Sequence, residues 1–368
     1  MRIRPLLPFC LLLSFSSAFS TPKSSCLSLL SENNLAKESD AAIYSKNADA
    51  NALYIKGLEY LSKGDARVGG SMLNAKKALE LFVQAVQKDP QFALAYLGQA
   101  EALGLSSFTV PGSSPPGKTY RQQEAAALKA VELDDKLSQA HVILAEIYFD
   151  NEYDWPKAEK ELKRVIELDP NRVLAHTRYG IFLGAMGRFD EAIAEVKLAQ
   201  KIDESSGAPN RAMMQVLYWQ HEDNAALAQG LEALRKDKVV LTHFSVGLIY
   251  IHQGQYEKAV EEMKLVTVLG DAGSLAALAY AYAMAGNKIE LDNVLDRFRR
   301  HPAHDHVPYY LAAVYVALGD KDRAIRLIEK DYRSRGYALN RLKVDPVMDP
   351  LRQEPRFKKL MRKMNFEQ

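Results

Sequence analysis

Small apolar residues recur along this chain at nearly constant intervals, within stretches rich in Ala, Leu, Glu and Lys. The recurring positions are Ala158, Ala192, Ala226, Ala259, Leu291 and Ala324. Their spacing of 32 to 34 residues is the period of a two-helix unit that stacks into a solenoid. The pattern therefore predicts a helical repeat array.

Two further positions follow the same period. A small residue, where a larger side chain would hold paired helices apart, occurs at Gly57, Gly98, Ala145, Gly180, Gly247, Ala279 and Ala312. An aromatic residue or Leu follows three positions later, at Tyr60, Tyr148, Leu183, Leu217, Tyr250, Tyr282 and Tyr315. We expect these residues to form the contact between the two helices of each unit.

Glycines mark the turn inside the units, at Gly64, Gly187, Gly254, Gly286 and Gly319. Glycine adopts the left-handed conformation that ends a helix without a steric penalty. Asp89-Pro90 and Asp169-Pro170 close two units, because proline suits the first turn of the next helix.

The order of these residues resembles the tetratricopeptide repeat (TPR), most clearly in residues 179–192 and 246–259. The resemblance implies an all-α fold, a right-handed α-solenoid of about eight TPR-like helix pairs with a C-terminal capping helix. Residues 93–98, the Pro-rich insertion 106–118, residues 125–134 and residues 153–155 are more specifically similar to arrays of bacterial regulators. Those arrays follow winged-helix, kinase or adenylate cyclase domains, and residues 342–360 resemble their capping segment.

The N-terminus differs from those regulators. Arg2 and Arg4 precede an apolar run over residues 6–19, and Ala18-Phe19-Ser20 is typical of a signal-peptidase site. We predict a signal peptide at 1–20, a flexible leader at 21–50, the solenoid at 51–338 and the cap at 339–368. The protein would be exported, to the periplasm or outside the cell, without stable membrane insertion after signal cleavage. Cys26 would be the single cysteine of the mature chain, and lipid modification there is a less favoured alternative.

Charge and motifs limit the function. A net charge of +2 argues against nucleic acid as a partner. The sequence contains no Gly-rich phosphate loop, paired-cysteine metal site or nucleophile elbow. We therefore expect a protein that is not an enzyme, with no cofactor, no metal and no catalytic residues. The alternative is a metal-dependent or hydrolytic enzyme with a site at His301–His306, whose imidazoles and carboxylate are potential metal ligands.

The TPR resemblance places a fixed set of positions on the concave face of the solenoid. These are Tyr54, Glu146, Phe149, Arg211, Gln215, Tyr218, Trp219, Phe244, His252, Tyr280 and Tyr309. Aromatic side chains and Arg dominate binding energy at interfaces, so this face is predicted to bind a protein or peptide partner. An equal alternative is that several of these rings fill the inside of the superhelix. Self-association and a sensor subunit acting in trans also stay open.

Overall fold

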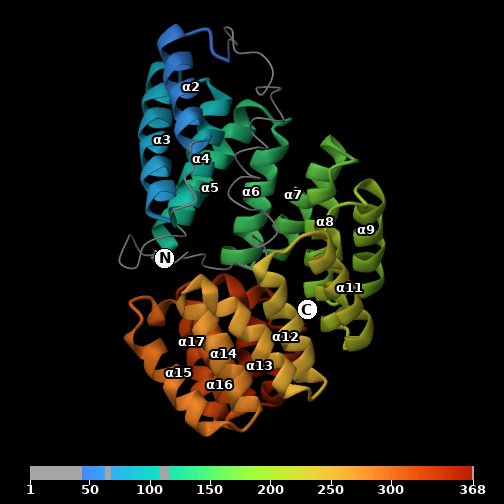
Figure 1. Ribbon diagram of the computed structural model, residues 1–368. Coiled ribbons are helices and arrows are strands. Elements are labelled where there is room, and N and C mark those ends of the chain that lie inside the picture. Colours follow the sequence, from blue (N-terminus) through green and yellow to red (C-terminus); the bar gives the residue numbers. More distant parts are fainter. Residues whose placement is uncertain (1–43, 63–67, 108–115, 367–368) are drawn as a thin grey trace, which may run out of the picture.

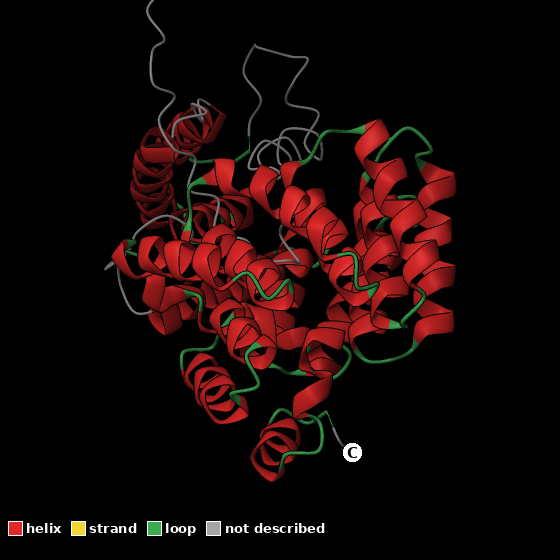
Figure 2. Cartoon of the chain, turned by 60° about the horizontal axis from the view of Figure 1, so that its bottom comes forward, coloured by secondary structure: helices red, strands yellow, loops and turns green. Residues whose placement is uncertain are grey.

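The computed structural model describes residues 44–62, 68–107 and 116–366, and these residues form helices joined by short turns, with no strand among them. Figure 2 shows this all-helical architecture. The helices pack in consecutive antiparallel pairs, which gives a TPR-like solenoid. The fold predicted from the sequence is confirmed.

In the described residues, eight helix pairs follow one another, and most of their helices are labelled in Figure 1. The first four are α2 (Ala48–Ser62) with α3 (Val68–Lys88), α4 (Ala93–Ser107) with α5 (Pro116–Leu133), α6 (Ser138–Ile147) with α7 (Trp155–Leu168), and α8 (Val173–Ala185) with α9 (Phe189–Ile202). The second four are α10 (Ala208–Trp219) with α11 (Asp223–Lys236), α12 (Val240–His252) with α13 (Tyr256–Val266), α14 (Ala272–Met284) with α15 (Lys288–Arg300), and α16 (Pro308–Ala317) with α17 (Lys321–Arg333). Short elements lie between or after them: η2 (Tyr148–Glu152), η3 (Thr267–Leu269), η4 (His304–His306), η5 (Tyr337–Arg341), η6 (Pro346–Leu351) and α18 (Pro355–Lys363).

The small residues hold the pairs at close range. Ala158, Ala192, Ala226, Ala259 and Ala324 have no exposed surface. A Cβ on Gly57 would lie 2.5 Å from the ring of Phe82, and one on Gly180 would lie 2.5 Å from the Val196 side chain. Such distances are shorter than packed carbon atoms allow, so glycine is required where these helices meet.

The turn glycines adopt the predicted conformation. Gly187, Gly254, Gly286 and Gly319 have φ values of 80°, 73°, 69° and 75°, in the left-handed region. After α8, the amide of Gly187 donates to the Gly184 carbonyl and that of Arg188 to the Leu183 carbonyl, which satisfies the last carbonyls of the helix. Gly64 lies outside the described residues.

The Pro-rich insertion at residues 106–118 is partly helical, because α4 extends into it up to Ser107 and α5 begins at Pro116. Its Pro and Gly content predicts a loop, and this prediction is wrong at both ends of the insertion. The predicted signal peptide, Cys26 and most of the leader lie outside the described residues, and α2 begins three residues before the predicted start of the solenoid. In the described part of the chain, no helix has the length and apolar character needed to cross a membrane.

The chain after α17 turns back into the array. We call residues 335–366 the C-terminal segment. Its apolar side chains are buried, with Leu339, Leu342, Met348 and Leu351 fully covered. It contacts η2 and α16 as well as α17, so the units from α6 to α17 close on themselves around it.

Candidate functional site

Most of the residues predicted for the concave face are buried. Of the eleven, Glu146 is half-buried and the His252 side chain is 34% exposed. The other nine are buried: Tyr54, Phe149, Arg211, Gln215, Tyr218, Trp219, Phe244, Tyr280 and Tyr309. The eleven residues belong to α2, α6, η2, α10, α12, α14 and α16. The structure does not bring them together on one open surface.

Tyr54 lies apart from the others, in the core of the first units. Its ring centroid is 4.9 Å from that of Phe92, 5.4 Å from that of Tyr44 and 5.6 Å from that of Phe82. Burial raises the pKa of its phenol far above the usual value. This side chain fills the core rather than facing a ligand.

The residues of α10 are held by neighbouring helices. Arg211 pairs with Asp237, at the end of α11. The Tyr218 ring meets the His252 ring edge-on at 6.2 Å, and burial raises the Tyr218 pKa well above its ordinary value. Trp219 packs so closely on α8 that a Cβ on Gly184 would lie 3.2 Å from its ring.

The C-terminal segment packs on α16. We call the side of the array formed by η2 and the first helices of the units, up to α16, the inner wall. The Tyr309 hydroxyl donates a hydrogen bond of 2.6 Å to Oδ2 of Asp345, and Nε of Arg341 donates to the same oxygen at 3.0 Å. The Arg341 guanidinium lies 4.8 Å from the centroid of the Tyr309 ring. Tyr309 therefore binds a segment of its own chain through both its ring and its hydroxyl.

A second set of contacts joins this segment to η2 and the start of α7. The Tyr153 hydroxyl donates to the Gly336 carbonyl at 2.7 Å, and Nδ2 of Asn340 donates to Oδ1 of Asp150 at 2.6 Å. Nε1 of Trp155 donates to the Met364 carbonyl at 2.7 Å. We call these contacts between residues 150–155 and the C-terminal segment the seam.

Between the seam and α16, the C-terminal segment passes the turns of two further units. Nζ of Lys343 donates to the Met186 carbonyl at 3.0 Å, at the turn between α8 and α9. Nε2 of His221, at the turn between α10 and α11, lies 3.7 Å from Oδ2 of Asp349. Several of these bonds join a side chain to a main-chain carbonyl, a mode of recognition that depends little on the sequence of the bound segment.

The predicted cap, residues 339–368, includes most of the C-terminal segment that covers η2 and α16. Leu351, Phe357, Leu360 and Met361 are buried, as expected of a helix that covers the last unit, and α18 packs on α17. The cap prediction did not include residues 335–351 crossing the inner wall. No local sequence pattern indicates this path, because several partners are distant in sequence: Met186 lies 157 positions from Lys343, and Asp150 lies 190 positions from Asn340.

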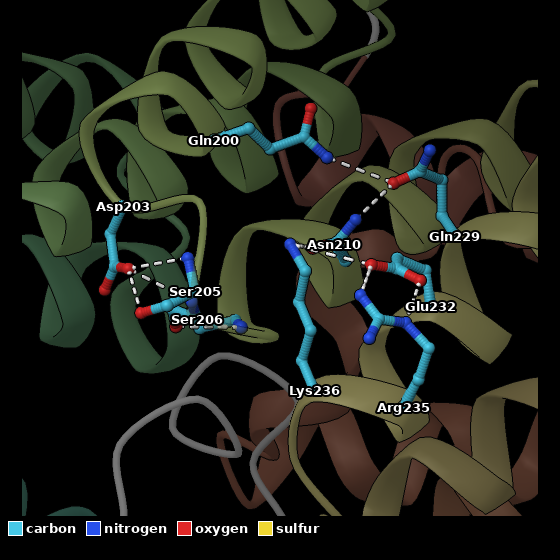
Figure 3. Close-up of polar contacts among 10 residues, drawn as sticks. Gln200, Asp203, Ser205, Ser206, Asn210, Gln229, Glu232, Arg235 and Lys236 are labelled. Atoms are coloured by element: carbon cyan, nitrogen blue, oxygen red, sulfur yellow. Dashed lines mark hydrogen bonds and ion pairs between the residues drawn. The ribbon is translucent and has the colours of Figure 1, made fainter.

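A ladder of polar pairs, which was not predicted from the sequence, joins the two helices within each of four successive units. Nδ1 of a histidine lies against a Glu oxygen in His141–Glu161 at 2.5 Å, His176–Glu195 at 2.7 Å and His243–Glu262 at 2.6 Å. The intervening unit has Asn210 and Gln229, whose amides bond at 2.8 Å (Figure 3). Figure 3 also shows Gln200 of α9 donating to the same Gln229 oxygen. The 33- to 35-residue spacing of these positions could have revealed the ladder.

In the predicted metal site at His301–His306, the described side chains of His301, His304 and Asp305 contact other groups of the protein. Nε2 of His301 faces the Gly270 carbonyl at 3.2 Å, and its Nδ1 accepts from the Ala303 amide. His304 faces the His301 carbonyl, and Asp305 pairs with Lys330 at 2.9 Å. Among the described residues, no group of three His, Cys, Asp or Glu side chains is arranged to hold a metal ion.

Comparisons with known proteins agree with the fold. The sequence profile of the tetratricopeptide repeat matches residues 242–267, which include most of α12 and all of α13. Among curated proteins, none matches the sequence. Yeast Tom70 is similar in structure, with a TM-score of 0.54 and 18% identity over 93% of this chain and 75% of Tom70.

Two further solved structures are similar. Human IFIT1, solved as a dimer with m7Gppp-AAAA, has a TM-score of 0.52 and 14% identity over 96% of this chain and 88% of IFIT1. YrrB, described as a TPR protein with an unusual peptide-binding site, has a TM-score of 0.36 and 17% identity over 52% of this chain and 94% of YrrB. Together with the repeat match, the similarity to Tom70 and IFIT1 identifies a TPR-type solenoid. The resemblance to regulator-linked arrays stays a prediction.

Proposed function

We propose that this protein is an exported, non-enzymatic scaffold whose inner helices bind an extended segment of another protein. TPR arrays create extended concave surfaces that such segments follow. The observation that supports the proposal is the path of the C-terminal segment. The inner wall from η2 to α16 already binds a polypeptide through aromatic rings, a phenol–carboxylate bond and side-chain donors to main-chain carbonyls.

The partner surface would continue from this bound segment onto the inner-facing groups that it leaves accessible. The His252 side chain is 34% exposed, with Nδ1 2.6 Å from Asp223. Glu146 is half-buried and pairs with Arg178 at 2.7 Å. A partner segment with both charged and aromatic side chains would match these groups.

Photo-crosslinking tests which face binds. A photoreactive phenylalanine analogue is placed at His252 or Glu146, and at the exposed outer residues Leu231 and Leu265 as matched controls. The inner positions should crosslink to one common partner protein in cells, and the outer positions should not. Equal crosslinking from the outer positions, or none from the inner ones, would refute binding by the inner helices.

Export is tested separately by cell fractionation and N-terminal sequencing of the mature protein. We expect the mature chain to begin at Thr21, outside the cytoplasm, because Ala18-Phe19-Ser20 has small residues at the positions that signal peptidase reads. A cytoplasmic protein that retains Met1 would contradict export and would favour a sensor subunit acting in trans.

A further inference from the structure

One buried position of the repeat carries a carboxyl group in α17 and an apolar side chain in the five preceding units. Seven residues after the recurring small residue, the units from α7 to α15 have Val165, Ala199, Ala233, Val266 and Phe298, all buried. The corresponding residue of α17 is Asp331, which is only 5% exposed. Packing in this register requires only an apolar side chain, so the carboxyl group calls for another explanation.

The Asp331 side chain packs against the first residues of the C-terminal segment. A Cβ added to Gly336 would lie 2.0 Å from its Oδ1, so the carboxyl group touches the Gly336 backbone. Among the described residues, no hydrogen bond or ion pair reaches the carboxylate. Burial raises the Asp331 pKa to about 7, although the charges of Arg341 and Lys330 oppose this shift.

Other charged or titratable groups face Asp331 from each neighbouring element. They are Lys330 on α17, Arg341 on the C-terminal segment and Tyr153 at the seam. Tyr332, Arg335 and Asp150 in turn interact with Tyr153. Arg341, the cation that lowers the Asp331 pKa most, already pairs with Asp345 at 3.0 Å. An ionised Asp331 would therefore gain solvation mainly by letting water enter beside Gly336.

The backbone next to Asp331 is strained on both sides of the seam. Tyr153 and Arg335 have φ values of 56° and 58°, a left-handed conformation that is unfavourable for residues with a Cβ. The Arg335 guanidinium donates to the Asn151 and Glu152 carbonyls at 3.4 and 3.3 Å, and the Tyr153 and Tyr332 rings stack at 5.9 Å. The three hydrogen bonds that define the seam are 2.6 to 2.7 Å long, so the long bonds of Arg335 and the two left-handed residues mark the part of the seam next to Gly336 as the place where the closed array can open.

We propose that the seam is a proton-gated clasp, in which neutral Asp331 lets Gly336 close on η2 and ionised Asp331 loosens the C-terminal segment from the inner wall. Opening frees Tyr153, Trp155 and the neighbouring wall. That a partner segment then binds to the freed residues rests on the proposed function. The opening of the seam does not rest on it.

Fluorescence of Trp155 tests the clasp, since its ring stacks on Phe366 at 4.7 Å within the seam. In a Trp219→Phe background Trp155 is the sole tryptophan, and its emission should shift to the red between pH 6 and 8, with a midpoint near 7. Asp331→Asn should abolish the shift and keep the closed-state emission throughout. Asp292→Asn, at an exposed position of α15, is the matched control and should keep the shift.

Asp331→Val provides a second variant, because Val165 and Val266 occupy the same register, and it should also stay closed. Circular dichroism of each variant verifies that it is folded. An unchanged titration in either folded variant, or no titration in the parent, would overturn the clasp. No partner is present in these measurements, so their failure leaves the crosslinking test of the proposed function untouched, and the reverse also holds.

Discussion

The indole of Trp155 donates a 2.7 Å hydrogen bond to the main-chain carbonyl of Met364, which lies 209 residues further along the chain. Trp155 begins α7, and Met364 directly follows α18. This bond ties the end of the chain to the middle of the repeat array. It makes the units from α6 to α17 mutually dependent, whereas a solenoid with open ends is held by contacts between neighbours.

Replacing Trp155 by Phe should loosen the end of the chain. The change keeps an aromatic ring next to Phe366 but leaves the buried Met364 carbonyl without its donor, which costs about 1 to 3 kcal/mol. We expect faster native-state proteolysis within residues 355–366 and a lower free energy of unfolding in urea.

Trp219→Phe is the control, because Nε1 of Trp219 is buried without a hydrogen-bond partner among the described residues. Its removal breaks no such bond, and proteolysis at the chain end should stay near the parent rate. Equal effects of the two substitutions would mean that the Trp155–Met364 bond does not hold the segment.

Two glycines of the helix contacts should tolerate alanine differently. At Gly180 the new Cβ would lie 2.5 Å from the branched Val196 side chain and 3.1 Å from the Ala192 carbonyl. At Gly247 it would lie 2.8 Å from the terminal methyl of Met263, which can rotate away. Overpacking costs roughly 1 to 3 kcal/mol, against a helix-propensity gain of about 1 kcal/mol from Gly to Ala.

Gly180→Ala should therefore lower the free energy of unfolding, and Gly247→Ala should leave it nearly unchanged. Urea denaturation of both variants at one pH provides the comparison. A larger loss at Gly247 than at Gly180 would show that the flexibility of the facing side chain does not decide the outcome.

Asp331 should make stability depend on pH. Burial raises its pKa in the folded protein to about 7, whereas the unfolded chain has the ordinary aspartate value of about 4. Between these values the folded state holds a proton that the unfolded state has lost. The contribution of Asp331 to the free energy of unfolding is thus fully present below pH 4. It decreases by about 1.4 kcal/mol per pH unit as the pH rises towards 7.

Asp331→Asn should remove this slope. The variant should exceed the parent in free energy of unfolding at pH 8, and the difference should shrink as the pH falls towards 4. Urea titrations at pH 4.5, 6 and 8 measure it, with Asp292→Asn as the exposed control. A parent whose stability rises with pH relative to Asp331→Asn would contradict the raised pKa.

Tyr309→Phe should weaken the hold of the inner wall on the C-terminal segment. Asp345 would lose the 2.6 Å bond from the phenol and keep the contact with Arg341. A buried hydrogen bond to a charged group contributes about 1.5 to 3 kcal/mol.

The half-buried Tyr315, whose ring faces Arg323 at 5.5 Å, serves as the control in Tyr315→Phe. Chemical denaturation should show the larger loss for Tyr309→Phe. Amide exchange at Val347, whose N–H donates to Asp345, should also become faster in that variant alone. Unchanged exchange there would show that the phenol does not position Asp345.

The aromatic residues show where sequence reasoning about the candidate site reached its limit. The repeat register predicted that Tyr218, Tyr280 and Tyr309 belong to the first helices of their units, and they lie on α10, α14 and α16. Whether each ring faces a partner or the chain itself depends on what covers it. An aromatic residue at helical spacing has the same local pattern in both cases.

The sequence by itself determined the repeat. Small residues at Ala192 and Ala259, contact glycines at Gly180 and Gly247, and left-handed turns at Gly187 and Gly254 are local requirements of a helix pair, so each leaves a trace at a fixed interval. The eight helix pairs and their order follow from these regularly spaced residues.

Only the tertiary structure decided what fills the inner wall. Leu339, Leu342 and Leu351 are apolar, and any buried surface would satisfy them. The hydrophobic effect is not directional, so burial alone does not name the surface. The path was selected by bonds such as Asn340 to Asp150 and Tyr153 to Gly336, between residues more than 180 positions apart, and no local period records a contact of that kind.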